Sequence, residues 1–525
     1  MSFSRVYSAQ THALKGAIVT IEADITKNSL HAFTVVGLPD KAVDESKDRV
    51  SGALKNSGYT SPKSQNQKIV VSLSPADLKK EGPYFDLAIA LGYLLSLGDI
   101  HFEPEKKLFL GELALNGEIK PIKGTLPLVR EAKAKGFQEV YVPMENAAEA
   151  ALIDGITIFG VNYLKEVIEH LDEKPHTPPS AKGLTPPLGT GGKIQKQPQT
   201  EITYAEEDHT TDFSDIRGQE AAKRGLEIAA AGGHNVVMSG PPGTGKTMLA
   251  KAFAGILPRL TLPEILEATG IYSIAGNLAR ELVTAPPFRS PHHTASYVSM
   301  IGGGTFPKPG EVTLAHHGVL FLDEFPEFEK RVIESLRQPL EDKVVTVSRA
   351  KGSVVFPSRF ILVAAMNPCP CGNRGALHKE CVCRQNDIAR YQRKISGPIM
   401  DRVDIWTHVG EVDYEKLSTT TREGEGSAEI KKRVERARAI QRKRFKNHPR
   451  SITTNTEMNT RDLASYVPLS EETKKLLNTT AEKLGLSARA YHRVIKLART
   501  IADLAESENV TTQHVLEALQ YRPKQ

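Results

Sequence analysis

The sequence has no long apolar run and few cysteines, and both absences narrow the class of protein. Among its 525 residues, the longest apolar stretch, Phe85–Leu97, is too short to span a bilayer and contains Asp86. The residues after Met1 contain no apolar core of the kind that a signal peptide requires. Four cysteines are too few for a disulfide scaffold in a chain of this length. We therefore expect a soluble cytoplasmic protein with no membrane partner.

The chain does contain enough apolar sequence for several folded domains. Hydrophobic residues make up 40% and charged residues 25%, which excludes bulk disorder. At about 150 residues per domain, the length predicts about three domains. The formal net charge is +6, but Ile430–Arg450 alone holds ten Lys or Arg residues against one Glu. Any surface that attracts polyanions is therefore expected to be local, with this segment as its leading candidate.

Composition and periodicity divide the chain into four parts. Residues 1–171 alternate strand-like and helix-like patterns, which predict a mixed α/β domain. Residues 172–208 are rich in Pro, Gly, Thr and Lys without apolar periodicity, so we expect a flexible linker there. In residues 209–410, short apolar runs alternate with helical patterns, as in a parallel sheet covered on both faces. Residues 411–525 are helical and predict a small lid-like bundle.

A phosphate-binding loop is the strongest motif in the sequence. Its residues, GPPGTGKT, match G-x-x-x-x-G-K-[ST] and lie between the apolar run Asn235–Ser239 and a helical pattern. Glycines there let backbone N–H groups surround phosphates at a helix N-terminus, while Lys246 would reach the β- and γ-phosphates of ATP and Thr247 would ligate Mg²⁺. The expected nucleotide-binding residues are Gly240, Pro241, Pro242, Gly243, Thr244, Gly245, Lys246 and Thr247.

Two further apolar runs end in polar residues that suit ATP hydrolysis. The run Val319–Leu322 leads into Asp323 and Glu324, which we expect to hold Mg²⁺ and to activate the attacking water, respectively. The run Phe360–Met366 ends in Asn367, a residue that would orient the same water. This order of strands and polar ends predicts a complete hydrolytic site rather than a phosphate-binding loop alone.

Two arginines are candidates for the cation that phosphoryl transfer needs on its developing charge. They are Arg402, within SGPIMDRVD, and Arg489, within LSARAYHR, and either could instead be a surface arginine. The succession of phosphate loop, Asp-Glu strand, Asn strand, arginine loop and helical lid resembles AAA+ ATPases. In that superfamily the loop arginine usually serves a neighbouring subunit, so the resemblance implies a ring, most often a hexamer.

Longer motifs resemble the magnesium-chelatase-like ATPases of the YifB/ComM group. They are Pro287–Ser296, Ile301–Phe328, Leu336–Asp342 and Ala364–Asn373. The resemblance covers the whole chain except the linker. It implies an α/β fold in which an AAA+ parallel sheet and helical lid follow a Lon-protease-like α/β domain, itself of the ribosomal protein S5 domain 2-like type.

The N-terminal domain resembles the proteolytic domain of Lon but lacks the catalytic dyad. A Lon-type protease needs a serine after a Gly-Pro pair and a lysine just after the following Gly-Glu-Ile strand. Here Tyr84 follows the Gly-Pro pair, Leu126 stands at the lysine position, and Ser74 and Lys123 are out of register. We therefore expect no peptidase activity, and instead a domain that shapes the ring or binds DNA.

Two segments resemble elements of this clade that point into the ring pore. The segment Lys343–Val355 has the pattern of a basic hairpin, and Pro286–Gly310 resembles an insert in the second helix. Basic side chains there suit contact with a phosphate backbone, although a solvated hairpin tip would look the same. The adjacent histidines His292 and His293 lack the third ligand of a metal site. The expected DNA contacts are Arg349, Lys351, Arg289 and Lys308.

All four cysteines lie within fifteen residues, in the pattern C-x-C-x9-C-x-C. In a reducing compartment, this clustering favours a tetrahedral Zn²⁺ site inserted into the ATPase domain at residues 369–383. An iron–sulfur cluster and plain reduced thiols are the alternatives, and His378 could replace one ligand. The expected zinc ligands are Cys369, Cys371, Cys381 and Cys383.

The family resemblance implies an ATP- and Mg²⁺-dependent DNA motor with helicase and branch-migration activity. It would act in homologous recombination on single-stranded and branched DNA, integrating transforming DNA during competence beside a recombinase. Two other readings remain, namely a protein-remodelling ATPase and the motor subunit of a chelatase. The chelatase reading is weakened by the N-terminal module and by the lack of a D-x-S-x-S motif. Stimulation of hydrolysis by nucleic acid separates the first reading from the other two.

Overall fold

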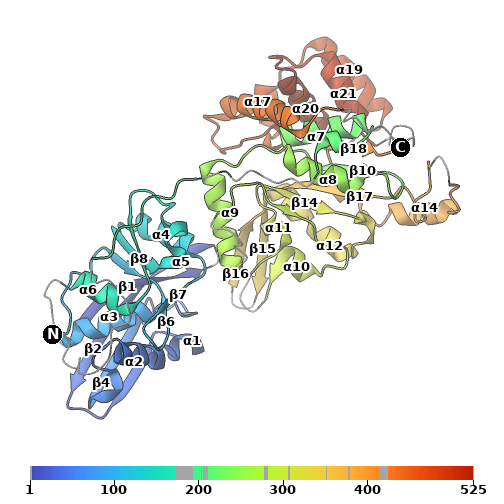
Figure 1. Cartoon of the computed structure of the whole chain (residues 1–525). Helices are drawn as coiled ribbons and strands as arrows, with labels where there is room; N and C mark the ends of the chain where they lie inside the picture. The colour runs from blue at the N-terminus through green and yellow to red at the C-terminus, as the bar shows by residue number, and fades with distance from the viewer. Residues whose placement is uncertain are drawn as a thin grey trace. The chain divides into compact units, whose positions relative to one another are not determined.

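The computed structural model divides the chain into two compact units (Figure 1). It describes residues 3–12, 14–172, 193–202, 204, 211–276, 282–304, 308–349, 352–376, 379–412 and 424–523. The first unit comprises Met1–Thr203 and Ile265–Val283, and the second comprises Tyr204–Glu264 and Thr284–Gln525. The second unit thus holds together the residues expected to form an ATPase core and those expected to form a helical lid.

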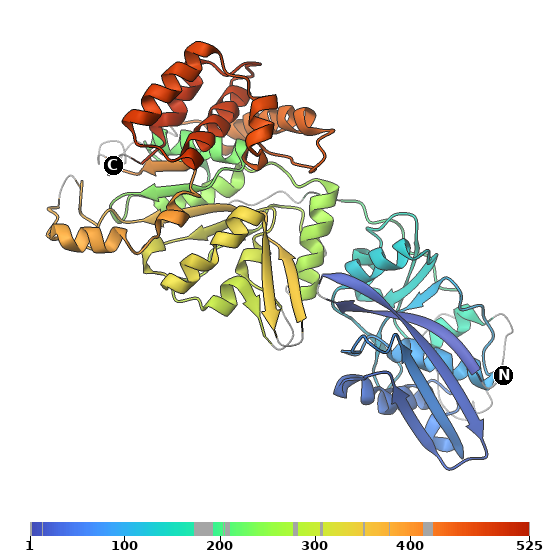
Figure 2. The ribbon, with the colours of Figure 1, turned by 180° about the vertical axis from the view of Figure 1, so that it is seen from behind.

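A four-stranded sheet with the order β1-β2-β4-β3 forms the base of the first unit. Strand β3 pairs with β4 in parallel, and the other neighbours are antiparallel. In β4 the side chains of Ile69, Val71 and Leu73 are buried while their neighbours are not, which gives the sheet one buried face. Helix α3 packs on β1 and β2, which are the long strands of this sheet in Figure 2. The elements are β1 (Phe3–His12), β2 (Lys15–Lys27), β3 (Ala32–Val36), β4 (Gln67–Ser74) and α3 (Asp86–Leu97).

A smaller parallel sheet, β5-β8-β9, and several short elements complete the first unit. Two consecutive helices, α1 and α2, are separated at Glu45. These elements are α1 (Lys41–Asp44), α2 (Ser46–Asn56), β5 (Lys107–Phe109), β6 (Glu112–Leu113), β7 (Ile119–Lys120), α4 (Thr125–Ala134), β8 (Glu139–Pro143), α5 (Met144–Ala150), β9 (Thr157–Val161) and α6 (Leu164–Leu171).

Part of the expected linker lies against the first unit. The backbone N–H of Ile194 donates to His170 Nδ1 at 3.1 Å, and Thr200 Oγ1 donates to the carbonyl oxygen of Ala148 at 2.7 Å. Because residues 194–200 bond to folded elements in this way, they do not form a free connection. Most of the other residues expected in the linker lie outside the part of the chain that the structure describes.

Helix α9 (Leu262–Ala275) lies within the expected ATPase domain in sequence, yet from Ile265 onward it belongs to the first unit. Ser273 Oγ accepts a hydrogen bond of 2.9 Å from the backbone N–H of Gly124. Two residues further on, Leu126 is buried at the position where a Lon-type protease would carry its lysine. A leucine side chain has no group that accepts a proton, so Leu126 cannot act as the base of a Ser–Lys dyad.

The second unit contains a five-stranded parallel sheet with the order β11-β14-β17-β10-β18. Its three central strands agree with the predicted apolar runs to within one residue at each end. The pairing Ser239–Met366 brings the ends of β10 and β17 together, and Leu322–Ala364 does the same for β14. The carboxyl ends of these strands therefore form one edge. The strands are β10 (Val236–Ser239), β11 (Phe288–Arg289), β14 (Val319–Leu322), β17 (Ile361–Met366) and β18 (Ile405–His408).

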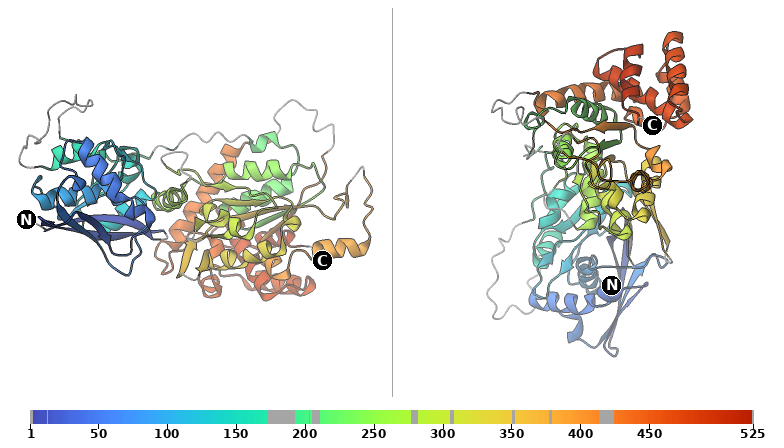
Figure 3. Two further views of the ribbon diagram at one scale, coloured as in Figure 1. Left: turned by 90° about the horizontal axis from the view of Figure 1, so that it is seen from below. Right: turned by 90° about the vertical axis from the view of Figure 1, so that its right-hand side faces the viewer.

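The lid shares one hydrophobic core with this sheet. Val434 of α17 and Leu497 of α20 are buried in the same hydrophobic cluster as Val236 and Phe321 of the sheet. The helices of the lid gather at one end of the second unit (Figure 3). The expected boundary at residue 411 is therefore not a boundary of the core. Helices on and around the sheet are α7 (Glu220–Gly232), α8 (Lys246–Gly255), α17 (Ser427–Phe445), α18 (Thr460–Tyr466), α19 (Glu471–Lys483), α20 (Ala488–Leu504) and α21 (Thr512–Gln520).

The expected hairpin is present as the antiparallel pair β15 (Val344–Arg349) and β16 (Gly352–Pro357), whose strands run side by side in Figure 2. Lys351 lies outside the described residues. Among the residues that the structure describes, no helix has the length and apolar character needed to cross a membrane. Shorter elements of this unit are α10 (Tyr297–Ile301), β12 (Gly302–Gly303), β13 (Lys308–Pro309), α11 (Glu311–Leu314), α12 (Lys330–Ser335), α13 (Arg337–Asp342), α14 (Gln385–Gln392) and α15 (Gly397–Met400).

Candidate active site

The phosphate loop joins β10 to α8 in the geometry that its sequence predicts. Gly243 and Gly245 have φ values of +77° and +88°, a region that favours glycine, and each faces open space where a Cβ would be. Gly245 is the residue before the first turn of α8, so the backbone N–H groups of the loop and helix start converge on one point. This is a cradle that a phosphate group fits.

Lys246 and Thr247 connect this loop to the neighbouring strands. Lys246 Nζ donates to the carbonyl oxygens of Gly240 and Pro241 at 2.7 Å each, and to Asn367 Oδ1 at 3.3 Å. Burial lowers the pKa of Lys246, and the charge of Asp323 offsets part of that effect. A lysine held by neutral oxygens alone keeps its charge available for an anion.

The residues expected to hold Mg²⁺ are already in contact. Thr247 Oγ1 donates to Asp323 Oδ2 at 2.8 Å, and the other oxygen of Asp323 accepts from the backbone N–H of Glu324 at 2.9 Å. A hydroxyl and a carboxylate oxygen at this distance are the hard ligands that Mg²⁺ prefers. Three sequence-predicted groups therefore come together here, namely the phosphate loop, Asp323 and Asn367.

Glu324, the expected general base, has a partner that the sequence did not reveal. Its backbone lies at φ +50°, in the left-handed region that non-glycine residues rarely adopt. Its Oε2 is 3.1 Å from His293 Nδ1, and both side chains are partly exposed. His293 belongs to the segment that follows β11, which pairs with β14. A contact between residues 31 apart in sequence leaves no local signal, so only the sheet order could have indicated it.

The two candidate arginines do not join this group. Arg402 precedes β18, and its carbonyl oxygen accepts from Asn235 Nδ2 at 3.0 Å, immediately before β10. The phosphate loop follows the other end of β10, and four residues of strand span about 13 Å. Arg402 and the phosphate loop therefore lie at opposite edges of the sheet.

Arg489 lies on the same side as Arg402, because both contact one carboxylate. Glu341 bonds to the Arg402 guanidinium and is 3.8 Å from Arg489 Nη2. A cavity of about 240 Å³ opens beside them. Burial, together with the nearby guanidinium groups of Arg489, Arg337 and Arg493, lowers the pKa of Arg402. The residues that line this cavity include Glu341, Asp401, Arg402, Arg489, Arg493 and Lys496. Cations outnumber carboxylates there, so the cavity favours an anion.

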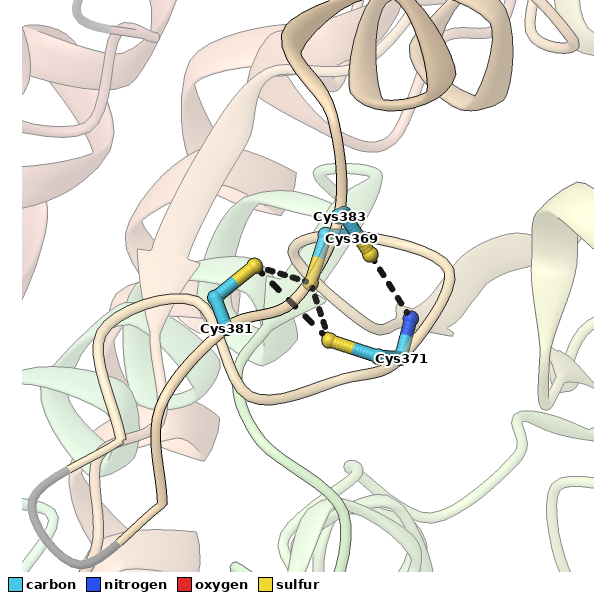
Figure 4. A group of neighbouring side chains, drawn as sticks. All are labelled: Cys369, Cys371, Cys381 and Cys383. Atoms are coloured by element: carbon cyan, nitrogen blue, oxygen red, sulfur yellow. Dashed lines mark hydrogen bonds between the residues drawn. The ribbon is translucent and has the colours of Figure 1, made fainter.

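The four cysteines converge as the sequence predicts (Figure 4). Cys369 Sγ lies 3.5 Å from Cys371 Sγ and 3.6 Å from Cys381 Sγ, and the latter two are 3.7 Å apart. The backbone N–H of Cys371 donates to Cys383 Sγ at 3.4 Å. Zinc–sulfur bonds of about 2.3 Å in a tetrahedron place sulfurs about 3.8 Å apart, so these residues fit a Zn²⁺ ion. His378 lies outside the described residues.

The cysteine thiols of the cluster differ in their pKa. A hydrogen bond from the backbone of Asn373 lowers the pKa of Cys371 to about 6. For Cys383 a backbone N–H favours the thiolate, but desolvation and the neighbouring sulfurs outweigh it and raise the pKa to about 12. Adjacent thiolates resist forming together unless a dication neutralises them.

The residues expected to contact DNA differ in their surroundings. Arg289 forms a two-point ion pair with Glu311, at 2.6 and 2.8 Å. Lys308 is exposed on β13. Arg349 lies at the end of β15, next to the tip of the hairpin.

The basic segment Ile430–Arg450 uses several of its charges inside the second unit. Arg433 Nε donates to Glu227 at 2.6 Å, Arg438 donates to the carbonyl oxygen of Ala230, and Arg444 pairs with Asp503. These arginines of α17 fasten the lid to α7 and α20. These contacts account for three of the ten positive charges without a polyanion, whereas Arg442, Lys443 and Lys446 of the same segment are exposed. A basic surface here stays a prediction that rests on the exposed side chains.

Comparisons with known proteins match nearly the whole chain. Residues 212–417 match the family described as magnesium chelatase, subunit ChlI, residues 21–146 match subunit ChlI of Mg-chelatase, and residues 424–522 match the ChlI C-terminal family. The chain is 40% identical over 524 residues to the competence protein ComM of Haemophilus influenzae, covering 99% of this chain and 98% of ComM. It is 39% identical to the uncharacterized protein YifB of Escherichia coli, covering 99% of this chain and 97% of YifB.

A shorter similarity concerns a protease. Over 104 residues, which is 20% of this chain and 19% of the relative, the chain is 34% identical to Lon protease 2 of Bacillus subtilis. This similarity supports the Lon-like α/β fold expected for the N-terminal domain.

Proposed function

The chain belongs to the YifB/ComM family of magnesium-chelatase-like AAA+ proteins, and from that premise we propose that it is an ATP-driven, ring-shaped DNA motor. The motor would act as a helicase and in branch migration during homologous recombination. The full-length similarity to a competence protein is the observation that carries this proposal. Its substrates would be single-stranded and branched DNA, with a recombinase as partner in the integration of transforming DNA.

The arrangement of side chains supports hydrolysis of ATP at the carboxyl edge of the sheet. Lys246 and the loop N–H groups would bind the phosphates, and Glu324 would take the proton of the attacking water. Asn367, held by Lys246, would orient that water. Thr247 and Asp323 would hold Mg²⁺, which neutralises charge on the phosphates when it is bound.

The site is incomplete within one chain, and this supports a ring. The stabilising cations Arg402 and Arg489 lie at the sheet edge opposite to the phosphate loop. We infer that both act on the nucleotide of a neighbouring subunit, whose phosphate would replace Glu341 as their partner. A closed ring of identical subunits, most often a hexamer in AAA+ proteins, gives every site its arginines.

DNA would contact the hairpin β15–β16 and the segment around β13. Arg349, Lys351 and Lys308 are the proposed contacts, because cations can follow a phosphate backbone without reading its sequence. Arg289 is a further proposed DNA contact, in which a phosphate would replace Glu311 as its ion-pair partner. A Zn²⁺ ion held by the four cysteines completes the proposal. A chelatase-type or protein-remodelling motor remains the second candidate, because the matched families are described as chelatase subunits.

Steady-state ATP hydrolysis tests the DNA motor directly. It would be measured without DNA and with single-stranded, duplex and four-way-junction DNA, using Glu324→Gln as the blank. We expect DNA to stimulate the wild type several-fold, and the variant to lose about 10²–10⁴-fold in rate because its general base is gone. Hydrolysis that is clear but indifferent to every DNA would refute the DNA motor and favour the second candidate.

The contact between His293 and Glu324 predicts a restraint on hydrolysis in the absence of DNA. A carboxylate in contact with a histidine must give up that contact before it can take a proton from water, so His293→Ala should raise the DNA-free rate by about two- to tenfold, the effect of one hydrogen bond. His292→Ala is the matched control, because His292 bonds to Thr294 instead. DNA-free rates that fall in His293→Ala alone would show that His293 assists the base rather than restraining it.

A further inference from the structure

The loop that carries the cysteine cluster packs against the phosphate loop. A Cβ placed on Gly372, between the cysteine pairs, would lie 2.8 Å from Pro242 Cδ of the loop and 3.9 Å from Asn367 Cγ. Gly372 is buried and has a φ of +80°, and its N–H donates to the carbonyl oxygen of Cys369 at 2.9 Å. The turn that carries two of the cysteines therefore packs against the residues that hold the phosphates.

The cluster is also tied to Asn367 at both of its ends. Cys369 follows Asn367 by two residues and is buried. Helix α14 begins two residues after Cys383, and its Tyr391, which is 6% exposed, hydrogen-bonds to the backbone of Asn367. The segment that begins after Asn367 thus packs against the phosphate loop at Gly372 and comes back to the backbone of Asn367 at Tyr391.

Little besides the cysteines can hold this loop in place. Among the described residues from 370 to 384, only Gly372 is buried, and Val382 is 83% exposed. Without an apolar core, a loop of this length does not keep one conformation against its conformational entropy. A metal ion on four thiolates would supply that missing free energy, as in other small metal-stabilised folds.

We propose that Zn²⁺ on these four cysteines positions the nucleotide site, by pressing Gly372 against Pro242 and fixing Asn367 beside Lys246. Zinc has no part in the chemistry and would be a structural support for hydrolysis. The role rests on the proposed ATPase activity, but it does not depend on whether the motor acts on DNA. The same contact would also let bound nucleotide tighten the cysteine loop.

Two glycines of the loop offer a matched pair of variants. Gly372→Ala would push a methyl group into Pro242, whereas Gly375→Ala has a similar φ of +83° but nothing within 4 Å of the added carbon. Both variants should retain one zinc per chain by elemental analysis. We expect Gly372→Ala to lower the DNA-free kcat by about tenfold or more, since small misplacements at a phosphoryl-transfer site are costly, and Gly375→Ala to stay within about twofold of wild type.

A readout independent of activity uses trypsin, because Arg374, Lys379 and Arg384 are exposed in the loop. A non-hydrolysable ATP analogue should slow cleavage there in the wild type and Gly375→Ala, but not in Gly372→Ala. Removal of zinc by Cys381→Ser should accelerate cleavage and lower kcat to the level of Gly372→Ala. Three results would each overturn the proposal. The first is that zinc removal changes neither cleavage nor kcat, and the second is that the wild type contains no zinc. The third is that the two glycine variants have equal effects. A wild type that binds zinc and shows nucleotide-dependent protection but never hydrolyses ATP would instead contradict the proposed function.

Discussion

Arg402→Ala should abolish ATP hydrolysis while leaving nucleotide binding intact. The guanidinium lies across the sheet from its own phosphate loop, so its loss removes no contact to the nucleotide bound by the same chain. Loss of the equivalent charge in phosphoryl-transfer enzymes costs about 10³-fold or more in kcat. The rate would be measured in steady state, and binding by titration with a fluorescent ATP analogue. Arg337→Ala is the control, because Arg337 is a more exposed arginine nearby that pairs with Glu334.

Mixing two inactive variants tests whether the arginine acts between subunits. Arg402→Ala has an intact phosphate loop, and Lys246→Ala has intact arginines but a damaged loop. In a mixed ring, some interfaces join a good loop to a good arginine, so hydrolysis should return at a fraction of the wild-type rate. If mixed rings form, as shown by copurification of differently tagged chains, yet stay inactive, the assignment of Arg402 to a neighbouring site is wrong.

The sequence predicted the phosphate side of this site because its information is local. The strands β10, β14 and β17 are continuous apolar runs, and each is followed directly by candidate site residues. Parallel strands end at one edge, so motifs far apart in sequence could be expected to meet. The cysteines were equally predictable, since all four ligands lie within fifteen residues.

What the sequence did not reveal depends on contacts between distant residues. Glu341 joins Arg402 and Arg489 across 61 and 148 positions, and no pattern in the chain marks it. The arginines of α17 were interpreted as a surface because their partners, Glu227 and Asp503, lie elsewhere in the sequence. Strand β11, of two residues, is too short to give an apolar run.

Helix α9 shows the same limit at the level of domains. Its sequence follows α8 and was assigned with it to the ATPase domain, yet Ser273 bonds to Gly124 and the helix joins the first unit. The order of elements along the chain suggests that α9 belongs to the same domain as α8. It does not show which apolar surface the helix packs against, and that packing decides the unit to which it belongs.

Asp404→Asn should strongly destabilise the second unit, because the carboxylate lies at the centre of a buried network. It is 3% exposed, pairs with Arg493, and accepts a hydrogen bond of 3.0 Å from the backbone N–H of Asn235. Removing one partner of a buried ion pair costs about 3–5 kcal/mol, since the other charge is left without compensation. For a unit of this size, that is a fall in Tm of about 6–20 °C in thermal unfolding. The exposed Asp342→Asn should unfold within about 2 °C of the wild type.

The pH dependence of this effect identifies the carboxylate as its source. Burial disfavours the charged form of Asp404, but Arg493 and His234 outweigh burial and hold its pKa well below the usual range. A depressed pKa in the folded state means that the stabilisation is fully present above the unfolded pKa of about 3.9 and is lost as the pH falls through lower values. The Tm gap between wild type and Asp404→Asn should therefore narrow from about pH 4 downward. Burial lowers the pKa of His234 and Asp404 opposes part of that lowering, so the His234 pKa falls further in Asp404→Asn. Between about pH 8 and 5 the gap should therefore not narrow, and it should widen where the His234 ring of the wild type becomes protonated. A gap that instead closes between about pH 7 and 6 would place the titrating group on a histidine and exclude Asp404 as the origin of the stability.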